Sequence, residues 1–339
     1  MKNTKDLPVW LKLLAAISMV SGLIACGGGG GSSGSGPSSI PTSYAAAAAP
    51  GELVTYNIDT AALTYSYTIT ESQYGLTNQT GSGTLTRVAN NVYTLSGIPN
   101  STIAVLPNGM MTGSIRHNFG AGLQTVPVMG ISNPVSSVAA LAGTYNYISR
   151  GCSSISACAS YIGTLQLTSG GNWTFCSGGN GSGCTLTGGG TLQALGSGKF
   201  AAYDGGTLVG TLFATSSGGQ NVVLIDLKDS RSGPTSLGKG LVVASSQAAI
   251  NTALTNGSWV ASGSTGNWGT FNLNNTTITY TSLNGSAISS SSTGTLDSPW
   301  LGLVTTSSGG STYRSLLAGY GVYVSAGPSG YIELGIKYQ

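Results

Sequence analysis

Charge is scarce in this 339-residue chain, because Asp, Glu, Lys and Arg together make up 6% of it, against about 25% in typical soluble domains. The surface must therefore be solvated by Ser, Thr, Asn and Gly. Removing the first 25 residues leaves 12 − 3 = 9 basic and 9 − 1 = 8 acidic side chains, a net charge of +1. No basic patch of the kind that captures nucleic acid remains, so we expect no nucleic-acid partner.

Histidine is scarcer still, since His117 is the only one. A Ser-His-Asp system would need it as the base, but no G-x-S-x-G elbow occurs outside the Gly/Ser-rich run that follows residue 26. One histidine also cannot build a His-rich metal site, and no P-loop, H-E-x-x-H or EF-hand pattern is present. We therefore expect a solvent-facing or packed histidine, no catalytic residue, no metal, no cofactor and no enzyme activity.

Paired carboxylates are the remaining route to acid–base chemistry. The closest acidic pair after residue 25 is Asp226 and Asp229, beside Lys228 and Arg231. Asp226 ends the apolar run 222–225, so it stands either at a strand end that faces a cleft or in a polar turn after a buried strand. We expect the polar turn.

Four cysteines follow residue 26, namely Cys152, Cys158, Cys176 and Cys184. An even number in an exported chain indicates disulfides, and four cysteines allow three connectivities. We favour Cys152–Cys158 and Cys176–Cys184, because each pair brackets a stretch rich in Ser and Gly. Cross-pairing between neighbouring hairpins and four free buried thiols are the alternatives, whereas a zinc site is disfavoured because no C-x₂-C spacing occurs.

Short strands and turns are predicted for almost everything after residue 50. Val, Ile, Thr, Tyr and Phe alternate with small polar residues, and Gly-rich turn signals recur every 8 to 15 residues. In the last segment, Ile332, Leu334 and Ile336 point one way while Glu333 and Lys337 point the other. The pattern predicts an all-β fold with antiparallel sandwich- or barrel-type sheets.

Three β-regions are predicted, at 51–135, 136–245 and 246–339. A short linker helix is expected near 245–254, where a plausible Ser cap precedes Gln247, Ala248 and Ala249. An alternative is that the second and third regions form one domain, whose sheet closes only with the C-terminal strands and so protects its edges.

The first 25 residues have the parts of an export signal. Three lysines precede an apolar stretch over 13–25, which spans about 20 Å as a helix, short of the roughly 30 Å hydrocarbon core. The segment 23–26, Leu-Ile-Ala-Cys, resembles the bacterial lipobox. That resemblance implies cleavage before Cys26 and lipidation of Cys26, and Gly27 in place of Asp resembles the class sorted to the outer membrane. Residues 26–50 are uncharged and predict a flexible tether.

The function expected from these features is a non-catalytic ligand-binding, adhesive or structural role for an outer-membrane lipoprotein, with the membrane bound through its N-terminal lipid. The chain resembles Gly-rich hypothetical lipoproteins of Gram-negative bacteria. Exposed Trp and Tyr would suit a protein or carbohydrate ligand, although they can equally fill a β core. One alternative is a surface receptor, given a loose resemblance to transferrin-binding-type surface lipoproteins. Others are an extracytoplasmic hydrolase of envelope polymers and an integral outer-membrane barrel. The ligand-binding residues stay unknown at this stage.

Overall fold

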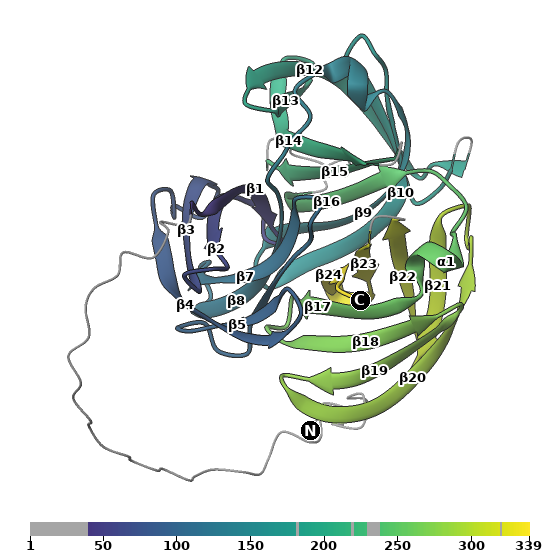
Figure 1. The fold of residues 1–339 in the computed structure, drawn as a ribbon. Coiled ribbons are helices and arrows are strands. Elements are labelled where there is room, and N and C mark those ends of the chain that lie inside the picture. The colour runs from purple at the N-terminus through teal and green to yellow at the C-terminus, as the bar shows by residue number, and fades with distance from the viewer. Residues whose placement is uncertain (1–39, 181–182, 218–219, 229–237, 319–320) are drawn as a thin grey trace, which may run out of the picture. The chain divides into compact units, whose positions relative to one another are not determined.

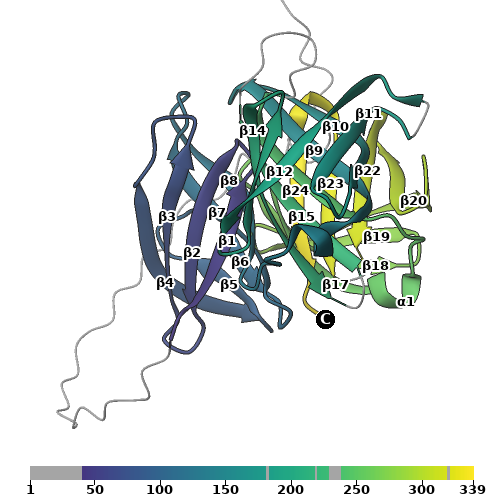
Figure 2. The same ribbon diagram turned by 90° about the horizontal axis from the view of Figure 1, so that it is seen from above.

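A computed structural model describes residues 40–180, 183–217, 220–228, 238–318 and 321–339, which belong to one compact unit, Ile40–Gln339. The strands pair antiparallel and close into three eight-stranded barrels (Figures 1 and 2). In each barrel, strands that are neighbours in sequence pair with each other, and the eighth strand pairs with the first. The prediction of an all-β fold with antiparallel, barrel-type sheets is confirmed.

Barrel 1, purple to blue in Figure 1, has a lumen packed with aromatic side chains. Tyr56, Tyr65 and Tyr67 lie against one another there, with ring centroids of Tyr56 and Tyr67 5.4 Å apart. Its strands are β1 (Thr42–Ala48), β2 (Glu52–Asp59), β3 (Thr64–Ser72), β4 (Thr80–Ala89), β5 (Val92–Leu95), β6 (Thr102–Val105), β7 (Met110–Asn118) and β8 (Leu123–Ile131).

Barrel 2, teal to green in Figure 1, follows a short 3₁₀ turn, η2 (Val138–Leu141). Tyr145, Tyr147, Leu165, Trp173 and Phe200 are among the side chains that fill its lumen. Its strands are β9 (Gly143–Ser154), β10 (Ala157–Leu167), β11 (Asn172–Ser177), β12 (Leu186–Gly196), β13 (Lys199–Asp204), β14 (Thr207–Ser217), β15 (Gln220–Leu227) and β16 (Lys239–Ser246).

Barrel 3, green to yellow in Figure 1, follows the short helix α1 (Thr252–Thr255) and includes a 3₁₀ turn, η4 (Pro328–Gly330). Trp259, Phe271 and Tyr323 form the aromatic part of its lumen. Its strands are β17 (Gly257–Gly263), β18 (Trp268–Asn274), β19 (Thr277–Leu283), β20 (Ser286–Leu296), β21 (Leu303–Ser308), β22 (Ser311–Ala318), β23 (Val322–Ala326) and β24 (Ile332–Lys337).

The predicted tether over 26–50 is too long, because β1 occupies 42–48 and completes barrel 1. β1 pairs with β2 on one side and with β8 on the other. Ala48 packs into the lumen of barrel 1, whereas Ala47 faces the neighbouring barrels, and both are fully buried. Both faces are therefore apolar, and an alanine run gives no alternation by which a strand is recognised.

The predicted linker helix near 245–254 is mostly wrong. Ser245 and Ser246 belong to β16, where they pair with Asn146 and Tyr145 of β9 and so help to close barrel 2. The helix is a single turn, α1, whose first turn is capped by the side chain of Asn251. The second and third β-regions close as separate barrels, with neither borrowing a strand from the other.

The outer faces of the three barrels share one apolar cluster, which we call the interbarrel core. Each fully buried Leu, Ile, Val or Phe contributes about 1.5–3 kcal/mol, so this cluster fastens the barrels together. It consists of Ala47, Ala49, Leu53, Met110, Met129 and Ile131 from barrel 1 and its edge, Ile148, Phe213, Val222, Leu224, Leu241 and Val243 from barrel 2, and Leu303, Leu316, Val322, Val324, Ala326, Ile332 and Leu334 from barrel 3.

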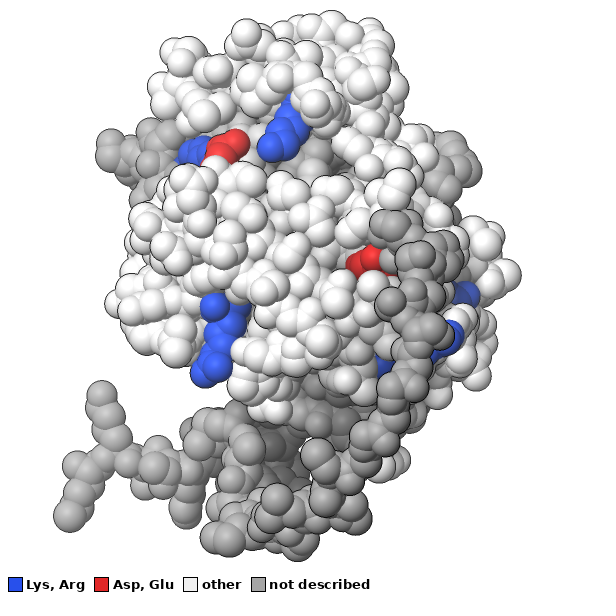
Figure 3. Space-filling model, turned by 60° about the vertical axis from the view of Figure 1, so that its left-hand side comes forward, with Lys and Arg blue, Asp and Glu red and all other residues white. Residues whose placement is uncertain are grey.

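Polar contacts also cross between barrels. Thr112 Oγ1 donates to the Leu334 carbonyl at 3.2 Å, and Arg150 Nε donates to the Gly330 carbonyl at 2.8 Å. Trp300 Nε1 donates to Asn146 Oδ1 at 2.9 Å. Elsewhere the surface is nearly free of charge, and Figure 3 shows only scattered Lys, Arg, Asp and Glu on the face that it presents.

Candidate functional site: a polar groove and two buried carboxyl clusters

A groove of about 560 Å³ lies over four neighbouring strands of barrel 2, β9 to β12. Two rows of side chains, defined by the strand register, line up across it. One row runs from Thr144 through Gln166 and Thr174 to Gly189. The other contains Thr164, Cys176 and Thr187, which are register partners on successive strands. We call it the threonine groove, after Thr144, Thr164, Gln166, Thr174, Asn180 and Thr187 of its lining.

These two rows face away from the barrel lumen. The row between them contains Leu165 and Phe175, which are register partners and belong to the packed core of barrel 2. Because side chains alternate across a strand, the residues on either side of that row point outward. The floor of the groove is therefore the outer surface of a closed sheet, whose strands are held by hydrogen bonds on both sides.

The loop between β11 and β12 is tied to this floor by a disulfide between Cys176 and Cys184, which both line the groove. A second disulfide joins Cys152 and Cys158 across the β9–β10 hairpin. Both pairings were predicted from the sequence and are confirmed. The alternatives of cross-pairing and free thiols are excluded for these four residues.

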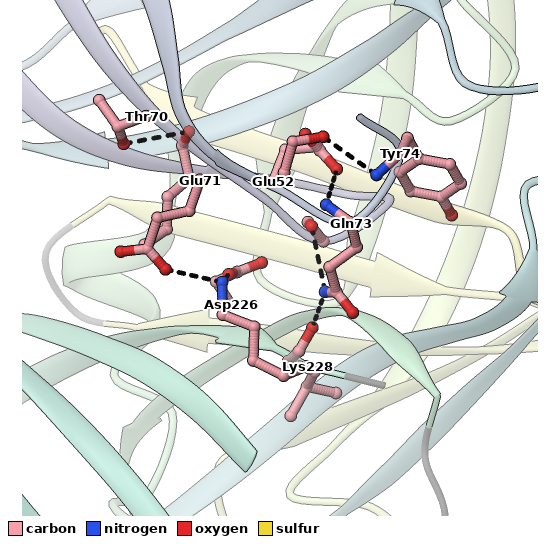
Figure 4. Close-up of polar contacts among 11 residues, drawn as sticks. Glu52, Thr70, Glu71, Gln73, Tyr74, Asp226 and Lys228 are labelled. Carbon is pink, nitrogen blue, oxygen red and sulfur yellow. Dashed lines mark hydrogen bonds and ion pairs between the residues drawn. The ribbon is translucent and has the colours of Figure 1, made fainter. Parts of the chain in front are cut away.

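A cluster of charged groups lies where barrel 1 meets barrel 2 (Figure 4). Lys228 Nζ is 2.9 Å from Glu71 Oε2 of barrel 1 and 2.5 Å from Asp226 Oδ2 of barrel 2, so one ammonium group bridges the two barrels. Gln73 donates from its main-chain N–H to Glu52 Oε1 at 3.0 Å and from Nε2 to the Leu227 carbonyl. Together they form a polar seam beside the interbarrel core.

The ionisation of this seam is strongly perturbed. Burial raises the pKa of Asp226 to about 7, although Lys228 opposes the shift and the nearby Glu52 and Glu71 reinforce it. Burial also raises the pKa of Glu52, against hydrogen bonds from Ser72 and Gln73. For Lys228, burial alone lowers the pKa, but the Asp226 and Glu71 carboxylates outweigh it and leave the pKa raised.

Asp226 is therefore not in a polar turn as predicted, since it lies inside β15 and is fully buried. An aspartate after an apolar run looks like the start of a turn, and only the packing of barrel 1 against β15 explains its burial. Asp229 and Arg231 lie outside the described residues, so the acidic pair identified in the sequence is not tested. The acidic groups that lie near Asp226 in the structure are Glu52 and Glu71, and both belong to barrel 1.

A second buried carboxyl, Glu333, lies in barrel 3 among tyrosines. Tyr280 donates its hydroxyl to Glu333 Oε2 at 3.2 Å. Burial raises the pKa of Glu333 to about 7, and hydrogen bonds from Tyr280 and Tyr323 only partly offset it. No ion pair to Glu333 occurs among the described residues. As the sequence pattern predicted, Glu333 lies on the opposite face of β24 from Ile332 and Leu334. That apolar row packs in the interbarrel core, whereas Glu333 faces the lumen, because its register partner Ser325 is on the same face of β23 as Tyr323.

His117 is a packed histidine, as expected. Its Nε2 is 3.1 Å from the Tyr67 hydroxyl, the two rings meet edge to face, and burial lowers its pKa. The tryptophans Trp173, Trp259 and Trp268 are buried, so they fill cores instead of forming a ligand platform. Within the described residues, no group of three or more His, Cys, Asp or Glu is placed to hold a metal ion. Cys26 and the predicted signal 1–25 lie outside the described residues.

Comparison with known proteins gives no family. No family model and no curated protein matches the chain. One solved structure, the glycoside hydrolase family 43 YxiA protein from Bacillus licheniformis, aligns with 87% of this chain and 83% of its own at 10% identity and a TM-score of 0.22. A likeness at that level supports no inference about fold or function. In the part of the chain that the structure describes, no helix is long and apolar enough to cross a bilayer.

Proposed function

We propose that the protein is a non-catalytic binding protein of the bacterial cell envelope, anchored to the outer membrane by lipid on Cys26. The observation that carries the binding role is the threonine groove, whose described lining residues offer uncharged hydroxyl and amide groups and include no Asp, Glu, Lys, Arg or His. Such a lining can hold a ligand but supplies no acid, base or strong nucleophile. The two disulfides support an oxidising, extracytoplasmic location.

The rigidity of the fold supports the same role. The three lumens are filled mainly by side chains of their own barrels, and the interbarrel core joins the barrels into one support for the exposed loops and the groove. Buried Asp226, Glu52 and Glu333 are the groups with the most altered carboxyl pKa values, and each is enclosed in packing. They therefore fit a structural role better than a catalytic one.

The anchor is tested by changing Cys26 to Ser and following incorporation of labelled palmitate and partition into the membrane fraction. We expect the variant to lose the label and appear in the soluble fraction, whereas Ser21→Ala, within the same apolar segment, keeps both. Retained label in Cys26→Ser would show that the lipid is elsewhere. The non-catalytic assignment is tested by incubating residues 40–339 with a panel of envelope polysaccharides and peptidoglycan, where release of new reducing ends or peptides would contradict it.

A further inference from the structure

The threonine, glutamine and asparagine side chains of the threonine groove form no hydrogen bond with the part of the protein that the structure describes. Thr144, Thr164, Gln166 and Thr174 form no side-chain hydrogen bond with any described residue, and the same holds for Asn180 and Thr187. Thr144, Gln166, Thr174, Asn180 and Thr187 are exposed. Thr164 is 8% exposed as a residue, but its hydroxyl is not a buried atom without a partner, so it too reaches solvent. The groove therefore holds a set of donors and acceptors that a ligand or water must satisfy.

The chemistry of these groups selects the kind of ligand. A hydroxyl is both donor and acceptor, and the amides of Gln166 and Asn180 offer both functions as well. A phosphate, carboxylate or ammonium ligand would have to give up hydration and would find no charged partner among the described lining residues, which is costly. A neutral molecule carrying many hydroxyls can donate hydrogen bonds to these lining groups and accept hydrogen bonds from them.

The geometry favours an extended ligand over a small one. The groove is open to solvent, and its volume of about 560 Å³ falls within the range of roughly 300–1,000 Å³ typical of ligand sites. Its two rows of side chains repeat from strand to strand, so hydrogen-bonding groups recur at about the 4.8 Å spacing of neighbouring strands. A repeating chain of similar units can use several rows at once, which a single small molecule cannot.

The site is also held in place before any ligand arrives. Thr144, Thr164 and Thr174 are β-branched, so each has few rotamers to lose on binding. Their backbones belong to strands paired on both sides within barrel 2. The Cys176–Cys184 disulfide fixes the loop that borders the groove. Little conformational entropy is therefore lost when hydrogen bonds to a ligand form.

From these observations we infer that the threonine groove binds a segment of a neutral oligosaccharide or polysaccharide. This inference rests on the proposed binding function and names its site and ligand class. Hydroxyls of successive sugar units pair with the two rows on β9 to β12, and Thr164 supplies the most enclosed contact.

The test is calorimetric titration of residues 40–339, which contain all three closed barrels, with the hexasaccharides of cellulose, starch amylose and chitin and with dextran. Heparin and polygalacturonate serve as charged comparisons. We expect saturable binding of at least one neutral probe and none of the charged polymers. Thr164→Val, which keeps the shape but removes the hydroxyl, and Gln166→Ala should each weaken that binding about fivefold, which corresponds to roughly 1 kcal/mol for one hydrogen bond.

Two matched controls separate the groove from general effects. Thr86→Ala changes an exposed threonine of β4 in barrel 1 and should leave the affinity unchanged. Removing Cys176 and Cys184 together should weaken binding, whereas removing Cys152 and Cys158 together should not, because only the first pair borders the groove.

Absence of saturable binding to every neutral probe would overturn the inference, as would tighter binding of a charged polymer. Equal affinity of Thr164→Val, Gln166→Ala and the parent chain would also overturn it, because the ligand would then lie elsewhere. Failure of the Cys26 experiment would instead remove the envelope anchor while leaving the groove in place, so the two proposals fail independently.

Discussion

Glu333 gives the sharpest stability prediction. Its pKa is raised by burial from 4.5 to about 7 in the folded chain. A shift of about 2.5 units at roughly 1.36 kcal/mol per unit corresponds to about 3 kcal/mol. Between pH 4.5 and 7 the folded state binds the proton more tightly than the unfolded state. The stability that the protonated group provides is therefore fully present below pH 4.5 and is lost as the pH rises through 7.

Replacing Glu333 with Gln should remove this loss. The amide keeps the shape of the side chain and still accepts a hydrogen bond from Tyr280, but it is never charged. We expect the free energy of unfolding of the variant to exceed that of the parent by up to about 3 kcal/mol at pH 8 and to match it closely at pH 4.5. Asp226 titrates in both proteins, so the difference between them isolates Glu333.

The measurement is urea unfolding at a series of pH values, followed by tryptophan fluorescence, to which Trp259 beside Tyr323 in barrel 3 contributes. Tyr280→Phe is the companion variant, because it removes one hydrogen bond to Glu333. This substitution should lower the free energy of unfolding more at pH 8, where the carboxylate is charged, than at pH 4.5. A pH dependence that is unchanged in Glu333→Gln, or a variant less stable than the parent at pH 8, would refute the reasoning.

Three further predictions concern the contacts between and within the barrels. Lys228→Met should lower the free energy of unfolding by about 3 kcal/mol at pH 8, because it leaves the charged Asp226 buried without its cation. The loss should be clearly smaller at pH 5, where Asp226 is protonated, and equal losses at the two pH values in urea unfolding would contradict this. Removing Cys152 and Cys158 together should lower the free energy of unfolding by about 2 kcal/mol, because the loop that this disulfide closes is short. An unaltered melting temperature would show that the disulfide does not stabilise the fold. Phe213→Ala should cost about 3–5 kcal/mol, because Phe213 is fully buried in the interbarrel core, and a loss below 1 kcal/mol would mean that the barrels are not held together there.

The sequence predicts the class of this fold well, for physical reasons that are local. Alternating residues in segments such as 332–336 indicate strands, and Gly-rich turns mark where they end. The disulfides were also accessible, because each joins cysteines within one hairpin or loop. Barrel closure was not accessible, since pairing of β1 with β8 or β9 with β16 depends on register over a long stretch of chain.

The site itself depends on that register. Thr144, Thr164 and Thr174 each adjoin an aromatic or apolar residue in the sequence, yet nothing in it shows that they stand side by side. Asp226 was misjudged for a similar reason, because Glu71, with which it shares Lys228, comes from another barrel. The alanines of β1 were misjudged because a strand buried on both faces has no polar face to reveal it.

The meander order of the barrels has a consequence for how the chain folds during synthesis. The first strand of a barrel stays unpaired on one side until the eighth strand arrives, about 75 to 96 residues later in the chain. Until then each growing sheet exposes two free edges, which readily pair with other chains. Completing one barrel before the next begins limits this exposure to one sheet at a time. The short connectors at 132–142 and 247–256 lie between complete barrels, so all eight strands of one barrel are synthesised before the first strand of the next.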